Sequence, residues 1–452
     1  MVNDMMKDSI FNNYFTPGVS IIYYGTIIAL LLLWSDGNIP GALRYPFALL
    51  PFLPAILVDR RWFWPSFIAT LTIFNNIPGH QFIFNPVFYL AIIAIVAIYH
   101  IIRERQVISP LEFVPFALCV AYMSAIDYAS GDDLSNNQYW WLGVFALLTL
   151  RPRGQDAASV GTLGRFPQKE LSANGDKYTI WGAYAFVLTS IIVSIVYMLN
   201  FSTYASKYSF TSEVMRSYYI DPNYQGGAIG MGVIFAIYFL LNNKARKLWL
   251  RVMCIVGIIV PMVALFALAS RGALLAVVVA IALVLAVSNT RIYVKIGFML
   301  LGVLLVAYSY SNNYMDLLIV RMQEKSLATG TSRTVIWASK LDAFMRDNNV
   351  LHWLFGIGRM NSLKLGEYHL DYAGAAFHNQ YLAMLVNYGL VGFFGFISLM
   401  ALPIVRVAKE KKVIVSILIL YLATICMTLE PLTTAFPAFY LFYFYTYIFA
   451  TR

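Results

Sequence analysis

The chain has 452 residues, of which 60% are hydrophobic and only 12% are charged, and its formal net charge is +10. A soluble protein carries about 25% charged residues, so a water-soluble globular protein is excluded. In a bilayer only helices and closed barrels satisfy their backbone hydrogen bonds, and the unbroken apolar runs lack the alternation of barrel strands. The sequence therefore predicts an all-α, polytopic integral membrane protein.

Apolar windows that can cross the hydrocarbon core recur along the whole chain. They predict about 12–14 transmembrane helices, drawn from windows at 19–35, 43–58, 62–78, 83–102, 109–127, 138–150, 179–201, 224–242, 250–268, 272–289, 293–311, 379–405, 413–429 and 437–450. The windows at 43–58, 138–150 and 437–450 are the weakest of them.

The basic residues predict the orientation of these helices. With a cytoplasmic N-terminus, 21 of the 32 lysines and arginines fall on the cytoplasmic side, as the positive-inside rule requires. The charge thus reflects topology, and we expect no nucleic-acid partner. Residues 151–178 then form a cytoplasmic loop and residues 312–378 a periplasmic loop, which is too long for a simple connection. We divide the chain into N-terminal transmembrane helices, 1–201, and a catalytic transmembrane region, 202–452.

The first candidate site residues stand where two inward-running helices begin. Asp221-Pro222-Asn223 is a turn-and-cap sequence that opens the helix at 224–242, and Arg216 lies in the short outer segment before it. Ser270-Arg271-Gly272 opens the helix at 272–289, and Arg271 is the only charged residue between positions 252 and 289.

Arg271 is badly placed on stability grounds, because a cation at a helix N-terminus opposes the helix dipole. An anion bound there would reverse the penalty, since the guanidinium and the free N–H groups of the first turn would both face it. The alternative is that Arg271 only extends its side chain to the membrane interface.

Three further candidates belong to the long loop and its exit. The segment SRTVIWASKLDAFM predicts a short helix from residue 332, on which Arg333 could add an anion contact, and Phe355-Gly356-Ile357-Gly358 predicts a tight turn. His378-Asn379 precedes an apolar run, and the positive end of a helix dipole favours the neutral imidazole that a general base needs. The alternative for His378 is a helix cap, and His369 is held as a reserve candidate.

Metal and cofactor patterns are missing from the sequence. It contains no paired histidines at helical spacing, no acidic cluster near an outer helix end, no Walker loop and no dinucleotide fingerprint. We therefore expect no cofactor and metal-free handling of a large anion at the outer face.

Together, DPN at 221–223, SRGALLA at 270–276, SRTVIW at 332–337, FGIG at 355–358 and HNQYLAMLVNYGLVG at 378–392 resemble the O-antigen ligase and O-antigen polymerase superfamily. The resemblance covers roughly residues 210–395. It implies an inverting glycosyltransferase of the GT-C type in the bacterial inner membrane, which acts at the periplasmic face on glycans carried by undecaprenyl diphosphate.

The resemblance also implies roles for single residues and partners. Arg216 and Arg271 would bind the lipid diphosphate, His378 would be the general base, and Asn223, Ser270, Arg333 and Asn379 are further substrate-binding candidates. The acceptor would be a lipid-linked glycan for a polymerase or lipid A-core for a ligase, with a chain-length regulator and a flippase as candidate partners. We favour the polymerase. The more distant alternative is a transporter or anion channel, whose usual inverted repeats are not visible here.

Overall fold

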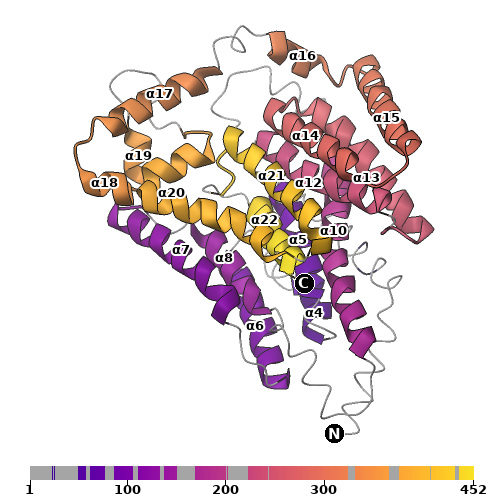
Figure 1. The fold of residues 1–452 in the computed structure, drawn as a ribbon, viewed down its shortest axis with the longest axis horizontal. Helices are drawn as coiled ribbons and strands as arrows, with labels where there is room; N and C mark the ends of the chain where they lie inside the picture. Colours follow the sequence, from indigo (N-terminus) through magenta and orange to yellow (C-terminus); the bar gives the residue numbers. More distant parts are fainter. Residues whose placement is uncertain are drawn as a thin grey trace, which may run out of the picture.

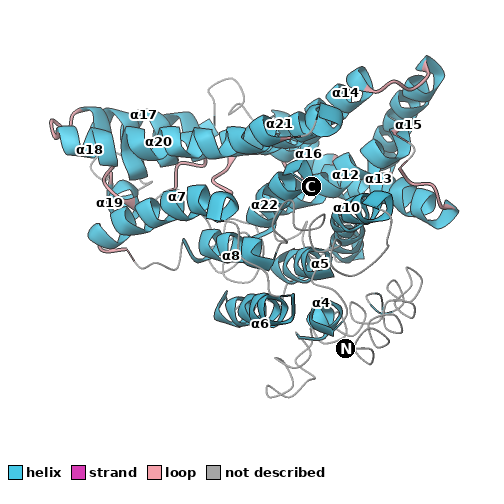
Figure 2. Ribbon diagram, turned by 60° about the horizontal axis from the view of Figure 1, so that its bottom comes forward, coloured by secondary structure: helices cyan, strands magenta, loops and turns pink. Residues whose placement is uncertain are grey.

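The computed structural model describes Tyr23, Gly25, Phe201 and residues 49–57, 62–76, 86–104, 110–132, 137–149, 168–199, 222–242, 244–323, 331–365, 376–407, 409–432 and 437–451. Every regular element within these ranges is a helix, and they contain no strand (Figure 2). The all-α fold class predicted from the sequence is confirmed.

Five of the described helices have the length and apolarity needed to cross a bilayer. They are residues 180–199 of α10 (Gln168–Leu199), α12 (Pro222–Leu241), α13 (Leu248–Ala267), α15 (Ile292–Ser311) and α20 (Gln380–Arg406). Shorter apolar helices accompany them, namely α5 (Phe63–Asn76), α6 (Pro86–Glu104), α7 (Pro110–Ala129), α14 (Arg271–Val287) and α21 (Lys412–Thr428). The protein is a multi-pass membrane protein.

Five further elements of the bundle fall in the weakest predicted windows. They are η3 (Leu50–Phe52), α4 (Leu53–Leu57), α8 (Gln138–Ala146), η7 (Leu147–Thr149) and α22 (Pro437–Thr451). The short helix η10 (Lys409–Lys411) joins α20 to α21. A nine-residue helix is only about 14 Å long, so α8 is too short to span the hydrocarbon core by itself. The window at 19–35 lies outside the described residues, apart from Tyr23 and Gly25.

The core of the bundle forms around α12. This helix packs against α10, α13 and α14, and nearly all of its side chains are buried. Phe186 of α10 lies between Phe235 of α12 and Tyr445 of α22, with ring centroids 5.8 and 5.5 Å away. One apolar core therefore crosses the boundary between residues 201 and 202, and the division of the chain there stays a prediction about roles.

The segment predicted as a loop at 151–178 is partly helical, while the membrane-crossing part of α10, Ile180–Leu199, agrees with the predicted window at 179–201. The loop expected at 151–178 is shorter, because α10 begins at Gln168 and residues 168–178 are helical. The helix-favouring residues Gln168, Lys169, Glu170 and Leu171 extend the apolar helix beyond its hydrophobic part, and nothing limits a helix to the thickness of the hydrocarbon. The cytoplasmic location of this loop stays a prediction.

The predicted loop at 312–378 is largely helical where it is described. It contains α16 (Asp316–Gln323), α17 (Thr331–Met345), α18 (Val350–Phe355) and α19 (Arg359–Lys364). The short helix expected from residue 332 is confirmed as α17. Figure 1 shows α17, α18 and α19 beside α20 at one edge of the bundle, and α16 near α15 and α13.

Candidate functional site

The starts of α12 and α14 lie side by side. The hydroxyl of Ser270 donates to Oδ1 of Asn223 at 3.0 Å, and the same oxygen of Ser270 accepts from the amide of Ala273 at 3.4 Å. Ser270 is therefore the N-cap of α14, and Arg271 is the first residue of the helix. Both helix starts occur where the turn-and-cap sequences predict them, and a hydrogen bond between side chains 47 residues apart joins them.

The end of α21 contacts the start of α14. A Cβ atom on Gly272 would lie 2.5 Å from Oγ1 of Thr428, so only glycine allows this approach without displacement of Thr428. The carbonyl oxygen of Thr428 also accepts from Nη1 of Arg333 at 2.8 Å. Thr428 of α21 therefore contacts the first turn of α14 and the first turn of α17.

The same segment of chain holds the start of α20. The amide of His378 donates to Oε1 of Glu430 at 2.5 Å, and the amide of Gln380 donates to the carbonyl oxygen of Leu429 at 2.9 Å. Asn379 is the N-cap of α20, because its Oδ1 accepts from the amides of Tyr381 and Leu382 at 3.0 and 3.2 Å. We name Thr428, Leu429 and Glu430 the 428–430 segment.

One face of α17 contacts the residues around His378. Arg333, Trp337 and Lys340 are spaced so that they share a face of a helix. The indole N–H of Trp337 donates to the carbonyl oxygen of Phe377 at 2.6 Å, and the buried ammonium of Lys340 lies 5.3 Å from the centre of the Phe377 ring. The SRTVIW motif therefore supports the chain immediately before His378.

The FGIG turn and the glycines of α20 form one joint. α20 is interrupted at Gly389, whose φ is +65°. The carbonyl oxygens of Val386 and Asn387, on the N-terminal side of this break, accept from the amides of Ile357 and Gly358 at 3.1 and 2.9 Å. The turn expected at 355–358 is confirmed, and it attaches the long loop to the interruption in α20.

Residues 256–397 match the protein family described as O-Antigen ligase. This segment belongs to the O-antigen polymerase and ligase superfamily. The match supports an activity of the ligase or polymerase type on a surface polysaccharide in a membrane. A comparison with curated proteins finds no match.

The superfamily segment contains Arg271, Arg333, His378 and Asn379 but ends before α21. Asn223 and the 428–430 segment lie outside it and complete the geometry by hydrogen bonds. Arg216, Asp221 and His369 lie outside the described residues. The roles of all the predicted site residues stay predictions, and the structure gives Ser270 and Asn379 capping bonds in addition.

Sequence reasoning missed two buried carboxylates. Glu430 is 6% exposed and follows the apolar run of α21, a position that marks ionisable residues in membrane proteins as functional candidates. Asp127 on α7 is fully buried, and its Oδ2 accepts from Tyr388 Oη at 2.8 Å and from Asn137 Nδ2 at 2.6 Å. Asp127 thereby supports α20 beside its break.

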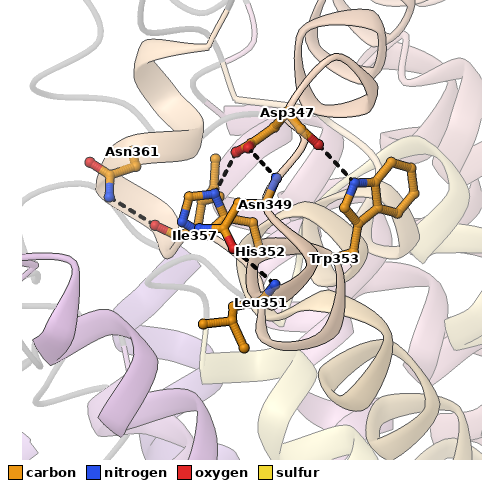
Figure 3. Close-up of polar contacts among 7 residues, drawn as sticks. All are labelled: Asp347, Asn349, Leu351, His352, Trp353, Ile357 and Asn361. Carbon is orange, nitrogen blue, oxygen red and sulfur yellow. Dashed lines mark hydrogen bonds and ion pairs between the residues drawn. The ribbon is translucent and has the colours of Figure 1, made fainter.

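A surface turn outside the spans fixes the start of α18. Asp347 faces the imidazole of His352 and accepts from the amide of Asn349 at 2.9 Å, while Trp353 Nε1 donates to the Asp347 carbonyl oxygen at 3.0 Å (Figure 3). The hydrogen bond from His352, followed by that from Asn349, holds the pKa of Asp347 below its usual range. His352 is therefore committed to a structural contact of the loop.

In the described part of the chain, no group of three or more histidine, cysteine, aspartate or glutamate residues could hold a metal ion. Two of the chain's arginines stand in the first turn of a helix, Arg271 in α14 and Arg333 in α17. Such an arrangement suits an anion such as a phosphate.

Proposed function

We propose that this protein is a glycosyltransferase that polymerises surface-polysaccharide repeat units from undecaprenyl diphosphate-linked glycans at the periplasmic face of the inner membrane. One observation carries the proposal. The 428–430 segment contacts the start of α14, the side chain of Arg333 and the amide of His378, which supports the proposal that the candidate anion-binding arginines and the candidate base act in one site.

The arginines would act on the leaving group. The diphosphate gains negative charge as its bond to C1 of the sugar breaks, so fixed guanidinium groups and the start of α14 stabilise the transition state more than the ground state. Arg271 is the main contact in this proposal, with Arg216 and Arg333 as further ones. Arginine binds phosphate through two parallel hydrogen bonds, which lysine cannot form.

His378 would act on the acceptor. Its neutral imidazole takes the proton of the attacking sugar hydroxyl, whose oxygen forms the new bond to C1 while undecaprenyl diphosphate departs with the bonding electron pair. Attack from the face opposite the leaving group inverts the anomeric centre. No cofactor takes part in this proposal.

A second acceptor is favoured by the family match, whose description is that of a ligase. In that case lipid A-core would receive the glycan. The two activities use the same donor and the same base, so only the product separates them. Longer lipid-linked chains indicate a polymerase, and glycan found on lipid A-core indicates a ligase.

The test uses purified enzyme in nanodiscs and the undecaprenyl diphosphate-linked repeat unit extracted from cells that lack this protein. Loss of a general base costs roughly a hundredfold to ten-thousandfold in turnover, so we expect that loss for His378→Ala with donor affinity retained. His378→Gln can orient a hydroxyl but cannot take its proton, and it should be equally inactive.

The control for this test is His352→Ala, which removes a histidine of the same loop that pairs with Asp347. It should keep the wild-type turnover. Normal polymerisation by His378→Ala, or complete inhibition of the wild type by EDTA, would show that the proposed metal-free base mechanism is wrong.

A further inference from the structure

The peptide unit between Phe377 and His378 is held at both of its polar groups. Its carbonyl oxygen accepts from Trp337 Nε1 at 2.6 Å, and its N–H donates to Glu430 Oε1 at 2.5 Å. A peptide unit is planar and rigid, so two bonds at opposite edges fix its rotation about the chain axis. The side chain of His378 is attached to the next backbone atom, its Cα.

The two bonds come from parts of the fold that are far apart in sequence. Trp337 lies on α17, and Glu430 follows α21. Glu430 is 6% exposed, and its bond to the His378 amide is part-buried. The positions of these two side chains are set by different packing, α17 against α20 and α21 against α14.

His378 also has an unusual backbone conformation. Its φ is +51°, in the left-handed region that non-glycine residues seldom occupy. Such a conformation persists only where the surroundings over-determine it. The bonds from Trp337 and to Glu430 constrain the peptide before His378. The capping bonds of Asn379 constrain the turn after it.

We infer that Trp337 and Glu430 are positioning residues, which fix the peptide before His378 and thereby hold its imidazole in the orientation for proton transfer. This inference rests on the proposed function, in which His378 is the base. A displacement of about 1 Å at a reacting group can cost about a hundredfold in rate, so loss of either bond should lower turnover and leave the binding of the lipid-linked donor unchanged.

The experiment compares kcat, KM for the extracted undecaprenyl diphosphate-linked repeat unit, and Tm in nanodiscs. Trp337→Phe keeps the ring and removes the N–H, and we expect kcat to fall about tenfold to a hundredfold with KM within twofold of wild type. The matched control is Trp353→Phe, which removes an indole N–H that donates to the carbonyl oxygen of Asp347 and not to that of Phe377. The control should keep the wild-type kcat.

Glu430 is tested with a conservative and a disruptive variant. Glu430→Gln keeps an oxygen that can accept from the His378 amide and should retain kcat within a few-fold, whereas Glu430→Ala should lose it as Trp337→Phe does. If Glu430→Ala does not fold, Trp337→Phe and Glu430→Gln decide between the outcomes.

Two results would overturn the inference. One is a wild-type kcat in Trp337→Phe, and the other is a fall in its kcat that comes with a raised KM and a lowered Tm, which a general loss of structure would produce. His378→Ala is measured beside them. Normal activity of that variant refutes the proposed function, whereas an inactive His378→Ala together with an active Trp337→Phe refutes the positioning role alone.

Discussion

The amide of Gly358 donates to the carbonyl oxygen of Asn387 at 2.9 Å, which fastens the long loop to the point where α20 is interrupted. A regular helix would bond that carbonyl internally, so the interruption at Gly389 creates the acceptor that the turn uses. Tyr122 of α7 adds a second support, because its hydroxyl donates to the carbonyl oxygen of Tyr388 at 2.7 Å. The FGIG motif and the glycine motif of α20 are thus two halves of one joint.

We predict that Gly389→Ala opens this joint. Gly389 has φ +65°, and a Cβ atom there would lie 2.4 Å from the carbonyl carbon of Leu354. The left-handed conformation alone costs on the order of 1–3 kcal/mol for a non-glycine residue, and the close approach adds to it. Tm should fall, and hydrogen exchange should increase at residues 354–358.

The control for this prediction is Gly297→Ala on α15. A Cβ atom at Gly297 meets nothing within 4 Å, and alanine favours a helix over glycine by about 1 kcal/mol. Tm should therefore stay the same or rise. Equal hydrogen exchange at residues 354–358 in Gly389→Ala and the wild type would contradict the joint.

We predict that Arg271→Lys inserts and folds normally but turns over about tenfold to a thousandfold more slowly, because lysine keeps the charge and loses the two-pronged contact with phosphate. The measurement is the turnover of the lipid-linked repeat unit. Arg291→Lys is the control, since Arg291 is also an arginine at a helix start, exposed, and its Nη1 donates to the Tyr293 hydroxyl. Wild-type turnover of Arg271→Lys would favour an interfacial role for Arg271.

We predict a pH-dependent contribution of Asp347 to the stability of α18. A folded-state pKa below the ordinary value means that the ionised carboxylate favours the folded turn. This stabilisation is fully present above the ordinary aspartate pKa of about 3.9, and it is lost as the pH falls through the lower folded-state pKa. For a partly exposed pair it should amount to no more than about 1 kcal/mol.

Hydrogen exchange of α18 in the wild type and in Asp347→Asn measures this contribution. The two proteins should differ near neutral pH and converge as the medium becomes more acidic. Asp342→Asn is the control, because the ion pair between Asp342 of α17 and Arg346, the residue just after this helix, is well exposed. A difference between the wild type and Asp347→Asn that grows with acidity would mean that the sign is wrong.

We predict that the long loop is periplasmic and the α12–α13 turn is cytoplasmic. Met345→Cys, at a side chain that is 63% exposed, should react with a membrane-impermeant maleimide in intact cells. Lys247→Cys, on the exposed turn before α13, should react only after permeabilisation. The native Cys254 and Cys426 are buried and Cys119 is partly buried, so they give little background. The reverse labelling pattern would invert the proposed topology.

The sequence alone determined the membrane class, the all-α fold and the places where α14, α17 and α20 begin. These features are local, because a helix start needs only a cap such as Ser270 or Asn379 followed by an apolar run. The motifs at 270–276, 332–337 and 378–392 also determined the superfamily. The sequence did not predict that α10 begins at Gln168, because polar residues that favour helices also occur in loops.

Only the tertiary structure decided which of these helix starts meet. The bonds from Arg333 to Thr428 and from His378 to Glu430 join residues 95 and 52 positions apart. The sequence pattern around Glu430 contains no trace of His378, because the bond depends on how α20 and α21 pack against each other. The peptide before His378 is held by Trp337 and Glu430, which lie far apart in the sequence. The periodicity of apolar residues predicts where each helix lies, but it does not predict which side chains of different helices meet.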